Sequence, residues 1–192
     1  MAAQALAQNG RHDALPAIAA ALSHENAQGT RVVMDYAMAL LGDKQALADL
    51  KKMCKSVSAS AMFRWSAAGY LRRLHDDSWI DGLIAVIQSE EQASLLLERG
   101  RNNLLNVGLL DLVTALPPDK ASGRQLDEIR EIAGDSLSAV SPDLRIAASQ
   151  ALAAFGDSAS AIRLEAAIAR EKDQDVRAHM QGDLEKLRLA ER

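Results

Sequence analysis

Four arginines occupy matching places in this chain, and they are the first residues whose chemistry needs an explanation. Arg31 and Arg145 each come before a Gly-Asp pair at the same distance, and Arg64 and Arg177 follow them at nearly equal intervals. A guanidinium presents five donors in one plane, so a row of arginines could hold an anionic ligand, or could bind carboxylates and open carbonyls of a neighbouring structural unit. We expect the second role, because the first requires all four side chains to face one open groove.

Metal and thiol chemistry have few candidate residues. The histidines, His12, His24, His75 and His179, are scattered without the spacing of metal ligands. Cys54 is the single cysteine, so neither an internal disulfide nor a zinc site of several thiolates can form, and we expect a small buried residue. The sequence has no Ser-His-Asp elbow, Walker loop or dinucleotide glycine fingerprint. We therefore expect no metal, no cofactor and no enzymatic activity.

The charge balance disfavours a nucleic-acid partner. The net charge is -4 and the pI is near 5.6, whereas phosphate binding requires clustered Lys and Arg. The longest basic cluster, Lys51, Lys52 and Lys55, fits a solvated helix face, although basic side chains distant in sequence could join it in space. No run reaches the roughly 18 apolar residues of a membrane span, and the first residues do not resemble a signal peptide. We predict no nucleic acid, no membrane and a cytoplasmic location, while an upstream signal stays open.

The composition indicates that helices position these side chains. Hydrophobic residues make up 48% and charged residues 25%, which is typical of a folded chain. Aromatic residues contribute only 3%, while alanine and leucine dominate, and such small or unbranched side chains suit closely packed helices. The predicted fold class is all-α.

A helix-turn-helix unit with a period near 32 recurs along the chain. We name the first helix of each unit A and the second B. Gly42 and Gly156 are expected to close an A helix in the left-handed conformation, and Asp43 and Asp157 to cap the B helix that follows. A partial first copy, with Gly10 one repeat period before Gly42, continues to Ile18, one period before Leu50. Tight turns between antiparallel helices follow.

The middle of the array departs from the pattern. In the third copy His75-Asp76 replaces Gly-Asp, so that only the glycine is lost. Arg64 and Arg145 are farther apart in the sequence than two repeat periods. We therefore expect an insertion around Gln88–Asn103 or Pro117–Arg124, which is either a binding element or a plain loop extension.

Prolines and caps help to place the helices. Pro142 suits the first turn of a helix capped by Ser141, and Pro16 should lie in the first turn of its helix or bend it. The expected helices cover about 2–9, 12–22, 28–42, 44–55, 59–75, 77–89, 92–116, 122–137, 142–155, 159–171 and 174–190.

The segment Ser141–Asp157, Ser-Pro-Asp-Leu-Arg-Ile-Ala-Ala-Ser-Gln-Ala-Leu-Ala-Ala-Phe-Gly-Asp, with the Asp-Gln-Asp-Val-Arg that comes later, resembles HEAT repeats. It is most similar to the short lyase-type repeats also found in phycobilin lyases. The resemblance is strong at 1–50 and 141–192 and weak at 90–140. It implies a right-handed α-solenoid of about five helical pairs, with A helices outside and B helices lining a concave face, in a single domain over 1–192. The incomplete outer repeats favour a piece of a longer protein.

Three classes of enzyme resemble this fold. The di-iron hydroxylase that modifies a translation factor requires several His-Glu pairs, and the chain has one, His24-Glu25. In a DNA glycosylase Trp65 or Trp79 could stack on a base beside Asp76 or Asp77, but the acidic balance argues against a groove for DNA. Phycobilin lyases hold a chromophore and a partner protein as paired subunits, and they offer no short catalytic motif to carry over to this chain.

The resemblance favours a non-enzymatic scaffold or adaptor, which binds a protein partner or another domain of its parent chain through the concave surface of the B helices. The alternative is a subunit of a phycobilin-lyase-like enzyme or another HEAT-like enzyme, which would have a deep pocket with converging polar groups. Exposed B-helix positions are the candidate contact residues: Lys51, Lys55, Asp81, Gln88, Glu128, Arg130, Glu131, Arg163 and Glu165.

Overall fold

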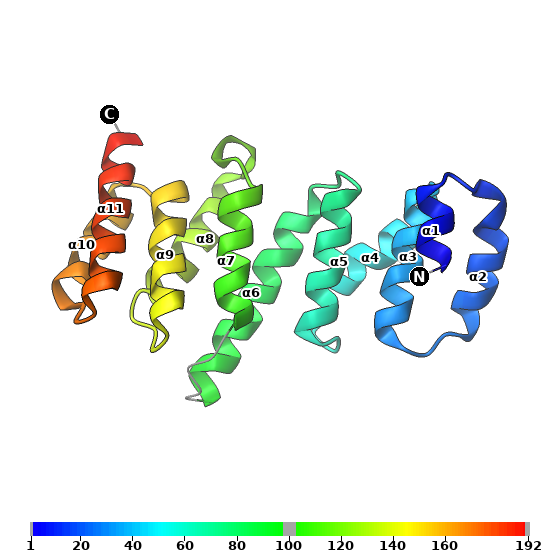
Figure 1. Ribbon diagram of the computed structural model, residues 1–192, viewed down its shortest axis with the longest axis horizontal. Coiled ribbons are helices and arrows are strands. Elements are labelled where there is room, and N and C mark those ends of the chain that lie inside the picture. The colour runs from blue at the N-terminus through cyan, green and yellow to red at the C-terminus, as the bar shows by residue number, and fades with distance from the viewer. Residues whose placement is uncertain (1, 98–102, 191–192) are drawn as a thin grey trace. The chain divides into compact units, whose positions relative to one another are not determined.

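The computed structural model describes residues 2–97 and 103–190, with side chains for 2–89 and 105–190. Across these ranges the secondary structure consists of helices and turns without a strand, which confirms the predicted all-α class (Figure 1). The helices are α1 (Ala2–Gln8), α2 (Leu15–His24), α3 (Gln28–Leu40), α4 (Lys44–Lys55), α5 (Ala61–Arg73), α6 (Ser78–Leu97), α7 (Asn103–Ala115), α8 (Gly123–Ser136), α9 (Pro142–Phe155), α10 (Ser158–Arg170) and α11 (Gln174–Ala190), with short 3-10 helices η1 (His12–Ala14) and η2 (Pro118–Lys120).

The chain divides into two compact units, Met1–Val86 and Ile87–Arg192, called unit 1 and unit 2 below. A single domain over 1–192 remains a prediction. In the A and B naming of the repeat, α1, α3, α5, α7, α9 and α11 are A helices, and α2, α4, α6, α8 and α10 are B helices.

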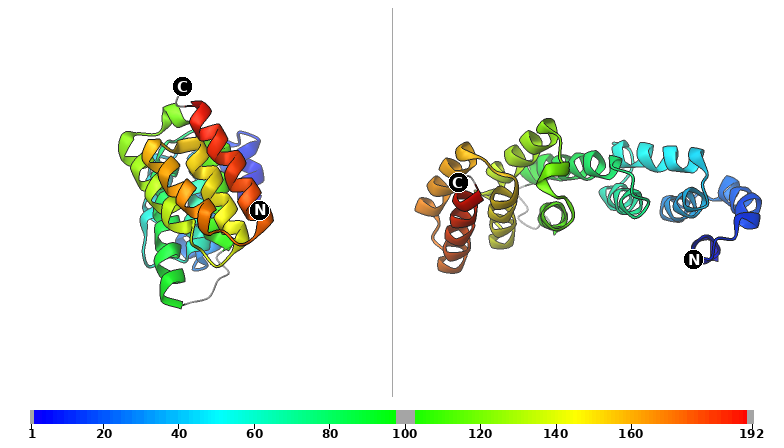
Figure 2. Two further views of the ribbon diagram at one scale, coloured as in Figure 1. Left: turned by 90° about the vertical axis from the view of Figure 1, so that its left-hand side faces the viewer. Right: turned by 90° about the horizontal axis from the view of Figure 1, so that it is seen from above.

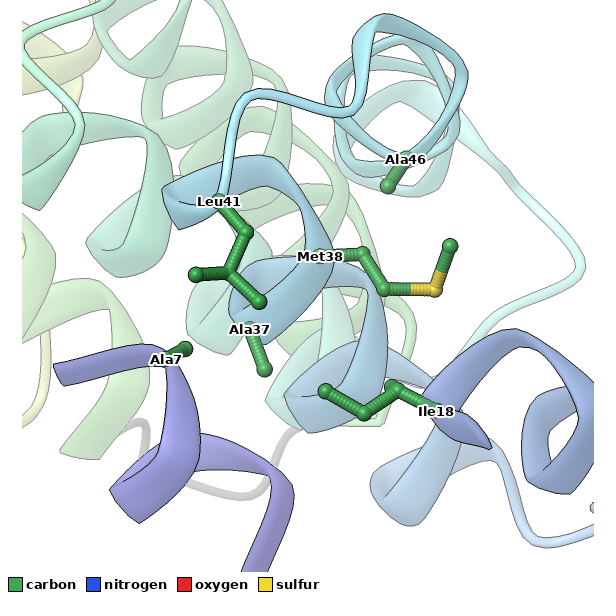
Figure 3. Close-up of a cluster of buried hydrophobic side chains, with 6 residues drawn as sticks. All are labelled: Ala7, Ile18, Ala37, Met38, Leu41 and Ala46. Carbon is green, nitrogen blue, oxygen red and sulfur yellow. The ribbon is translucent and has the colours of Figure 1, made fainter. Parts of the chain in front are cut away.

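Unit 1 is built around α3, which packs against α1, α2, α4 and α5. Figure 3 shows the core between them, where Ala37 and Met38 of α3, with Leu41 directly after it, meet side chains of α1, α2 and α4. Ala7 and Ala37 are both buried, and their small size allows α1 and α3 to approach closely. The core is therefore made of small and aliphatic side chains, as the composition indicates; its members are Ala7, Ile18, Ala37, Met38, Leu41 and Ala46.

The three A helices of unit 1 end in the same way. Among the described residues, positive φ angles occur at Gly10 (66°), Gly42 (92°) and His75 (55°), which hold the same place in successive repeats. At each turn the next residue donates its N–H to the carbonyl five positions back, which is the Schellman pattern. The bonds are Arg11 N to Leu6 O, Asp43 N to Met38 O and Asp76 N to Leu71 O, each 3.0 Å long. The expected left-handed Gly42 is confirmed, and His75 adopts the same conformation without being glycine.

The corresponding turn of unit 2 is different, and the expected left-handed Gly156 is wrong. Its φ is -74° and its ψ is 176°, so the chain leaves α9 in an extended conformation. A glycine is required there for space, because an added Cβ would lie 2.2 Å from the Leu152 carbonyl oxygen. The predicted caps of the following helices are confirmed: Asp43 accepts from Ala46 N and Asp157 from Ser160 N, both at 2.9 Å.

In unit 2, α9 lies between α7 and α11 and also packs against α8, while α10 contacts α8, α9 and α11 (Figure 1). The view from above in Figure 2 separates the row of α7, α9 and α11 from α8 and α10. Each of these helices contributes a side chain that is almost fully buried: Leu109, Leu112, Ile129, Leu152, Leu164, Met180 and Leu187.

The largest departure from the expected helices lies where the insertion was predicted. Helix α6 continues from Ser78 to Leu97 instead of ending near 89, and α7 begins at Asn103 instead of near 92. No Gly or Pro interrupts the sequence between Ile87 and Leu97, so nothing local ends the helix there. Residues 98–102 lie outside the described residues.

Both proline predictions are confirmed. Pro16 lies in the first turn of α2, and Pro142 lies in the first turn of α9. Ser141 caps α9, because its hydroxyl accepts from Leu144 N at 3.4 Å. Proline is tolerated at these positions because the first N–H groups of a helix have no partner within the helix.

Candidate functional site

The four recurrent arginines bind backbone carbonyls at the end of the preceding B helix or just beyond it. In unit 1, Arg31 Nη1 donates to Glu25 O at 2.9 Å and to Leu22 O at 3.2 Å, both at the end of α2. Arg64 Nε donates in the same way to Cys54 O in the last turn of α4, at 3.1 Å. The last carbonyls of a helix have no partner within it, and these arginines supply one.

The same contact recurs in unit 2. Arg145 Nη1 donates to Ala139 O at 2.9 Å and to Val140 O at 3.0 Å, just beyond α8. Arg177 Nη2 donates to the carbonyl of Glu171, the residue after α10. In three of the four cases an acceptor lies six residues before the arginine. The predicted structural role is therefore confirmed, and we call each of these contacts an arginine clamp.

Two of the clamping arginines also bind an acceptor that comes later in the sequence. The remaining nitrogens of Arg145 bind the Glu171 carboxylate at two points, 2.6 Å and 3.1 Å, and Arg64 Nη2 donates to Ala85 O of α6 at 2.9 Å. Glu171 is 8% exposed and also accepts from the backbone N–H groups of Lys172 and Asp173 at 2.9 Å. The Arg145 hydrogen bonds, outweighing the effect of burial, hold the pKa of Glu171 below its usual value. The clamp thus links consecutive helical pairs.

The candidate contact residues of unit 1 are Lys51, Lys55 and Asp81. Lys51 of α4 forms an ion pair with Asp76 at 2.7 Å, while Lys55 is exposed and Asp81 of α6 is half-buried. Burial opposes ionisation of Asp76, but hydrogen bonds from Lys51 and Ser78 outweigh it and lower the pKa of Asp76. Lys51 therefore fastens α4 to the turn before α6.

Gln88 lies on the part of α6 that belongs to unit 2, where its side chain is half-buried. Of the α8 candidates, Glu128 accepts from Arg124 at 2.7 Å, and Glu131 is exposed. On α10, Glu165 pairs with Arg188 of α11. Glu131 and Glu165 are exposed, as expected, whereas Glu128 is half-buried.

Arg130 and Arg163 connect neighbouring helices within unit 2. Arg130 Nε donates to Phe155 O at the end of α9 at 2.7 Å, and its Nη1 lies 3.4 Å from Asp157. Arg163 of α10 donates to Asp135 of α8 at 2.7 Å and reaches the Arg130 carbonyl at 3.5 Å. Both candidate arginines thus have structural partners, and their role in binding a partner protein stays a prediction.

Glycine makes room for one of these contacts. A Cβ added at Gly134 would lie 2.2 Å from the Arg163 Cζ and Nη1 atoms, so the guanidinium rests directly on the backbone of α8. Sequence reasoning missed Gly134, because a glycine within a helix shows no pattern that reveals what lies against it. It missed Glu171 for a similar reason, since this acceptor is 26 residues from Arg145.

The residues considered for thiol chemistry, metal binding and base stacking are Cys54, the histidines and acids, and the two tryptophans. Burial raises the pKa of the Cys54 thiol to about 12, so the reactive thiolate is scarce at neutral pH. Within the described part of the chain, no group of three or more His, Cys, Asp or Glu side chains could hold a metal ion. Trp79 is buried and Trp65 half-buried, and the Arg72 guanidinium lies 5.8 Å from the centre of the Trp79 ring.

No helix among the described residues has the length and apolar character to span a membrane. Comparisons with family models, curated proteins and solved structures found no match for this chain. The resemblance to HEAT repeats therefore remains a prediction from the sequence pattern alone.

Proposed function

We propose that this chain is a HEAT-like α-solenoid that acts as a scaffold, binding another protein or another domain of its parent chain through its B helices. The observation that carries the proposal is the recurrence of the arginine clamp. The arginine clamp is found at Arg31, Arg64, Arg145 and Arg177, at nearly the same repeat interval inside each of the two units. Modules that repeat with the same joint are typical of solenoids, whose extended surfaces bind other macromolecules.

The clamping arginines bind groups within the chain, and this favours a structural role for them over a catalytic one. The clamps bind carbonyls, and Cys54 is buried with a thiol that ionises poorly. A lyase-like subunit would need polar groups that converge on a pocket and remain available to a substrate. The clamping arginines do not offer such groups.

Helix α10 supports a protein partner in particular. Ile162 is 67% exposed on this B helix, and the neighbouring Arg163 and Glu165 lie at the surface in ion pairs. An exposed apolar residue surrounded by charged side chains is typical of the centre and rim of a protein interface. Phosphate binding would instead require clustered unpaired cations.

The test compares two exposed apolar residues of the same unit. Ile162→Arg changes the B-helix surface, whereas Leu189→Arg changes α11, an A helix, at a residue that is 66% exposed. A protein captured from the source organism's extract is purified, and its Kd for wild type and both variants is measured by titration. We expect at least a tenfold weaker Kd for Ile162→Arg and no more than a twofold change for Leu189→Arg.

Two results would contradict the proposal: no captured protein binds the purified chain, or Leu189→Arg weakens binding as much as Ile162→Arg does. Circular dichroism of both variants first checks that they are folded. Retention of a bound linear tetrapyrrole by the purified chain would favour the lyase-like alternative.

A further inference from the structure

Asp35 is an acidic residue with little exposed surface, and the described residues supply no hydrogen bond or ion pair to its carboxylate. It lies in the middle of α3 and is 6% exposed. Its neighbours in the sequence, Tyr36, Ala37 and Met38, are buried, and the last two belong to the core in Figure 3. A carboxylate that is largely removed from water and has no partner favours its neutral form.

The equivalent position in unit 2 shows how the repeat satisfies a polar side chain there. Ser149 of α9 corresponds to Asp35 of α3, because each comes one helical turn after its clamping arginine. The Ser149 hydroxyl donates to Asp183 of α11 at 2.7 Å and contacts the Ile146 carbonyl at 2.9 Å. Unit 1 therefore has an acid at a place where unit 2 has a small neutral donor with partners.

The charges around Asp35 do not compensate it. On the α4 side, Asp49 and the cap residue Asp43 both add negative potential at Asp35. The lysines of α4 lie elsewhere: Lys51 pairs with Asp76, and Lys44, Lys52 and Lys55 are exposed. Arg31, one turn earlier on α3, is the cation that favours the ionised form, but its Nη1 atom is held by the carbonyls of Leu22 and Glu25.

The other helices that pack against α3 bring no free counter-charge. Helix α1 has no ionisable side chain, and His24 at the exposed end of α2 is the only one on that helix. The cations of α5 lie against other groups: Arg64 on the Cys54 and Ala85 carbonyls, Arg72 on Trp79 and Arg73 on Tyr70.

We propose that Asp35 is a pH switch, whose protonation tightens the packing of α3 within unit 1 and whose ionisation loosens it. Burial, followed by the charges of Asp49 and Asp43, raises the pKa of Asp35 from 3.8 to about 6. An acid with a raised pKa in the folded state contributes stability that is complete below its unfolded pKa and is lost as the pH rises through about 6. The linkage relation gives roughly a tenfold rise in the unfolding constant of unit 1 between about pH 5 and about pH 7.

The chain carries its own reporter for this test. Both tryptophans and both tyrosines belong to unit 1, at Trp65, Trp79, Tyr36 and Tyr70. Urea unfolding of the whole chain, followed by tryptophan fluorescence at pH 5, 6 and 7, therefore reports on the unit that contains Asp35. Wild type is expected to lose stability as the pH rises across this range.

Three variants separate the switch from general effects of charge. Asp35→Asn removes the titration, so we expect a higher urea midpoint at pH 7 and no slope between pH 5 and pH 7. Asp49→Asn removes a neighbouring charge and should reduce the slope without abolishing it. Glu185→Gln, the matched control at an exposed site of unit 2, should keep the wild-type slope.

A flat wild-type profile, or the full slope retained in Asp35→Asn, would overturn the proposal. If Asp35→Asn does not fold, carbon NMR of the wild-type Asp35 carboxyl decides instead. A midpoint near pH 6 supports the switch, and a midpoint near pH 4 refutes it. Neither result depends on the proposed scaffold function.

Discussion

Arg145 and Glu171 form a two-point pair that joins the start of α9 to the turn before α11. Nε lies 2.6 Å from one carboxylate oxygen and Nη2 lies 3.1 Å from the other. Because Nη1 of the same guanidinium binds the carbonyls of Ala139 and Val140, one side chain connects the segments that precede two successive A helices. This planar arrangement suits arginine and cannot be reproduced by lysine.

Loss of the Glu171 charge should weaken unit 2. Glu171→Gln keeps the size of the side chain but removes the charge-assisted bonds from Arg145, so we expect a decrease of about 2 kcal/mol in the free energy of unfolding. Urea unfolding at pH 7, followed by circular dichroism, measures the change. Glu185→Gln on the exposed side of α11 is the control, and equal midpoints for both variants would contradict the expectation.

The same pair should make stability depend on pH in the acid range. The pKa of Glu171 lies below its ordinary 4.5, chiefly through the Arg145 hydrogen bonds. Its contribution is therefore complete above pH 4.5 and is lost as the pH falls through the lowered pKa. We expect the stability difference between wild type and Glu171→Gln to be constant from pH 5 to pH 7 and to shrink below pH 4. A difference that stays constant down to pH 3 would be inconsistent with this pair.

Relief of the left-handed strain at His75 should stabilise unit 1. A side chain at φ 55° is unfavourable by about 1 to 2 kcal/mol, part of which is offset because glycine is more flexible in the unfolded chain. We therefore expect His75→Gly to raise the free energy of unfolding by up to about 1 kcal/mol, measured by tryptophan fluorescence in urea. His75→Ala keeps the Cβ atom and should give no gain, so an equal gain from both variants would exclude strain as the cause.

Two glycine-to-alanine variants in unit 1 should have opposite effects. A Cβ at Gly82 of α6 would lie 2.8 Å from the Cβ and 3.0 Å from the Sγ of Cys54, so Gly82→Ala should destabilise by about 1 to 3 kcal/mol. At Gly69 of α5 an added Cβ meets nothing within 4 Å, so Gly69→Ala should stabilise by about 0.5 to 1 kcal/mol. Thermal unfolding measures the stability of both variants. Stabilisation by both would show that helix propensity outweighs the contact with Cys54, and destabilisation by both would contradict the expectation for Gly69→Ala.

Local signals in the sequence were sufficient to predict most helices, their caps and the role of the recurrent arginines. Asp43 and Asp157 cap helices as expected, because an N-cap depends only on the next three residues. The arginine clamps reach back ten residues or fewer, so their partners are close in the sequence. Caps and clamps can be predicted because both partners of each contact lie close together in the sequence.

Features that depend on packing could not be predicted from the sequence. Asp35 is a charged residue on an amphipathic helix, and nothing in its neighbourhood reveals that it is buried. Gly156 and Gly42 share the Gly-Asp motif. Gly42 is left-handed, whereas Gly156 is extended, and the shared motif does not distinguish the two conformations. Arg130 and Arg163 were expected to be contact residues at the surface, and their acceptors lie on helices 25 to 33 residues away.

The short reach of the clamp has a consequence for how such a chain can evolve. Arg31 and Arg145 each hold carbonyls that lie no more than nine residues upstream, so the whole joint is encoded in one short stretch of DNA. In the solenoid that we propose, a duplicated or deleted helical pair would therefore carry its own arginine clamp with it. Such a change in length would leave the contacts of the other clamps intact.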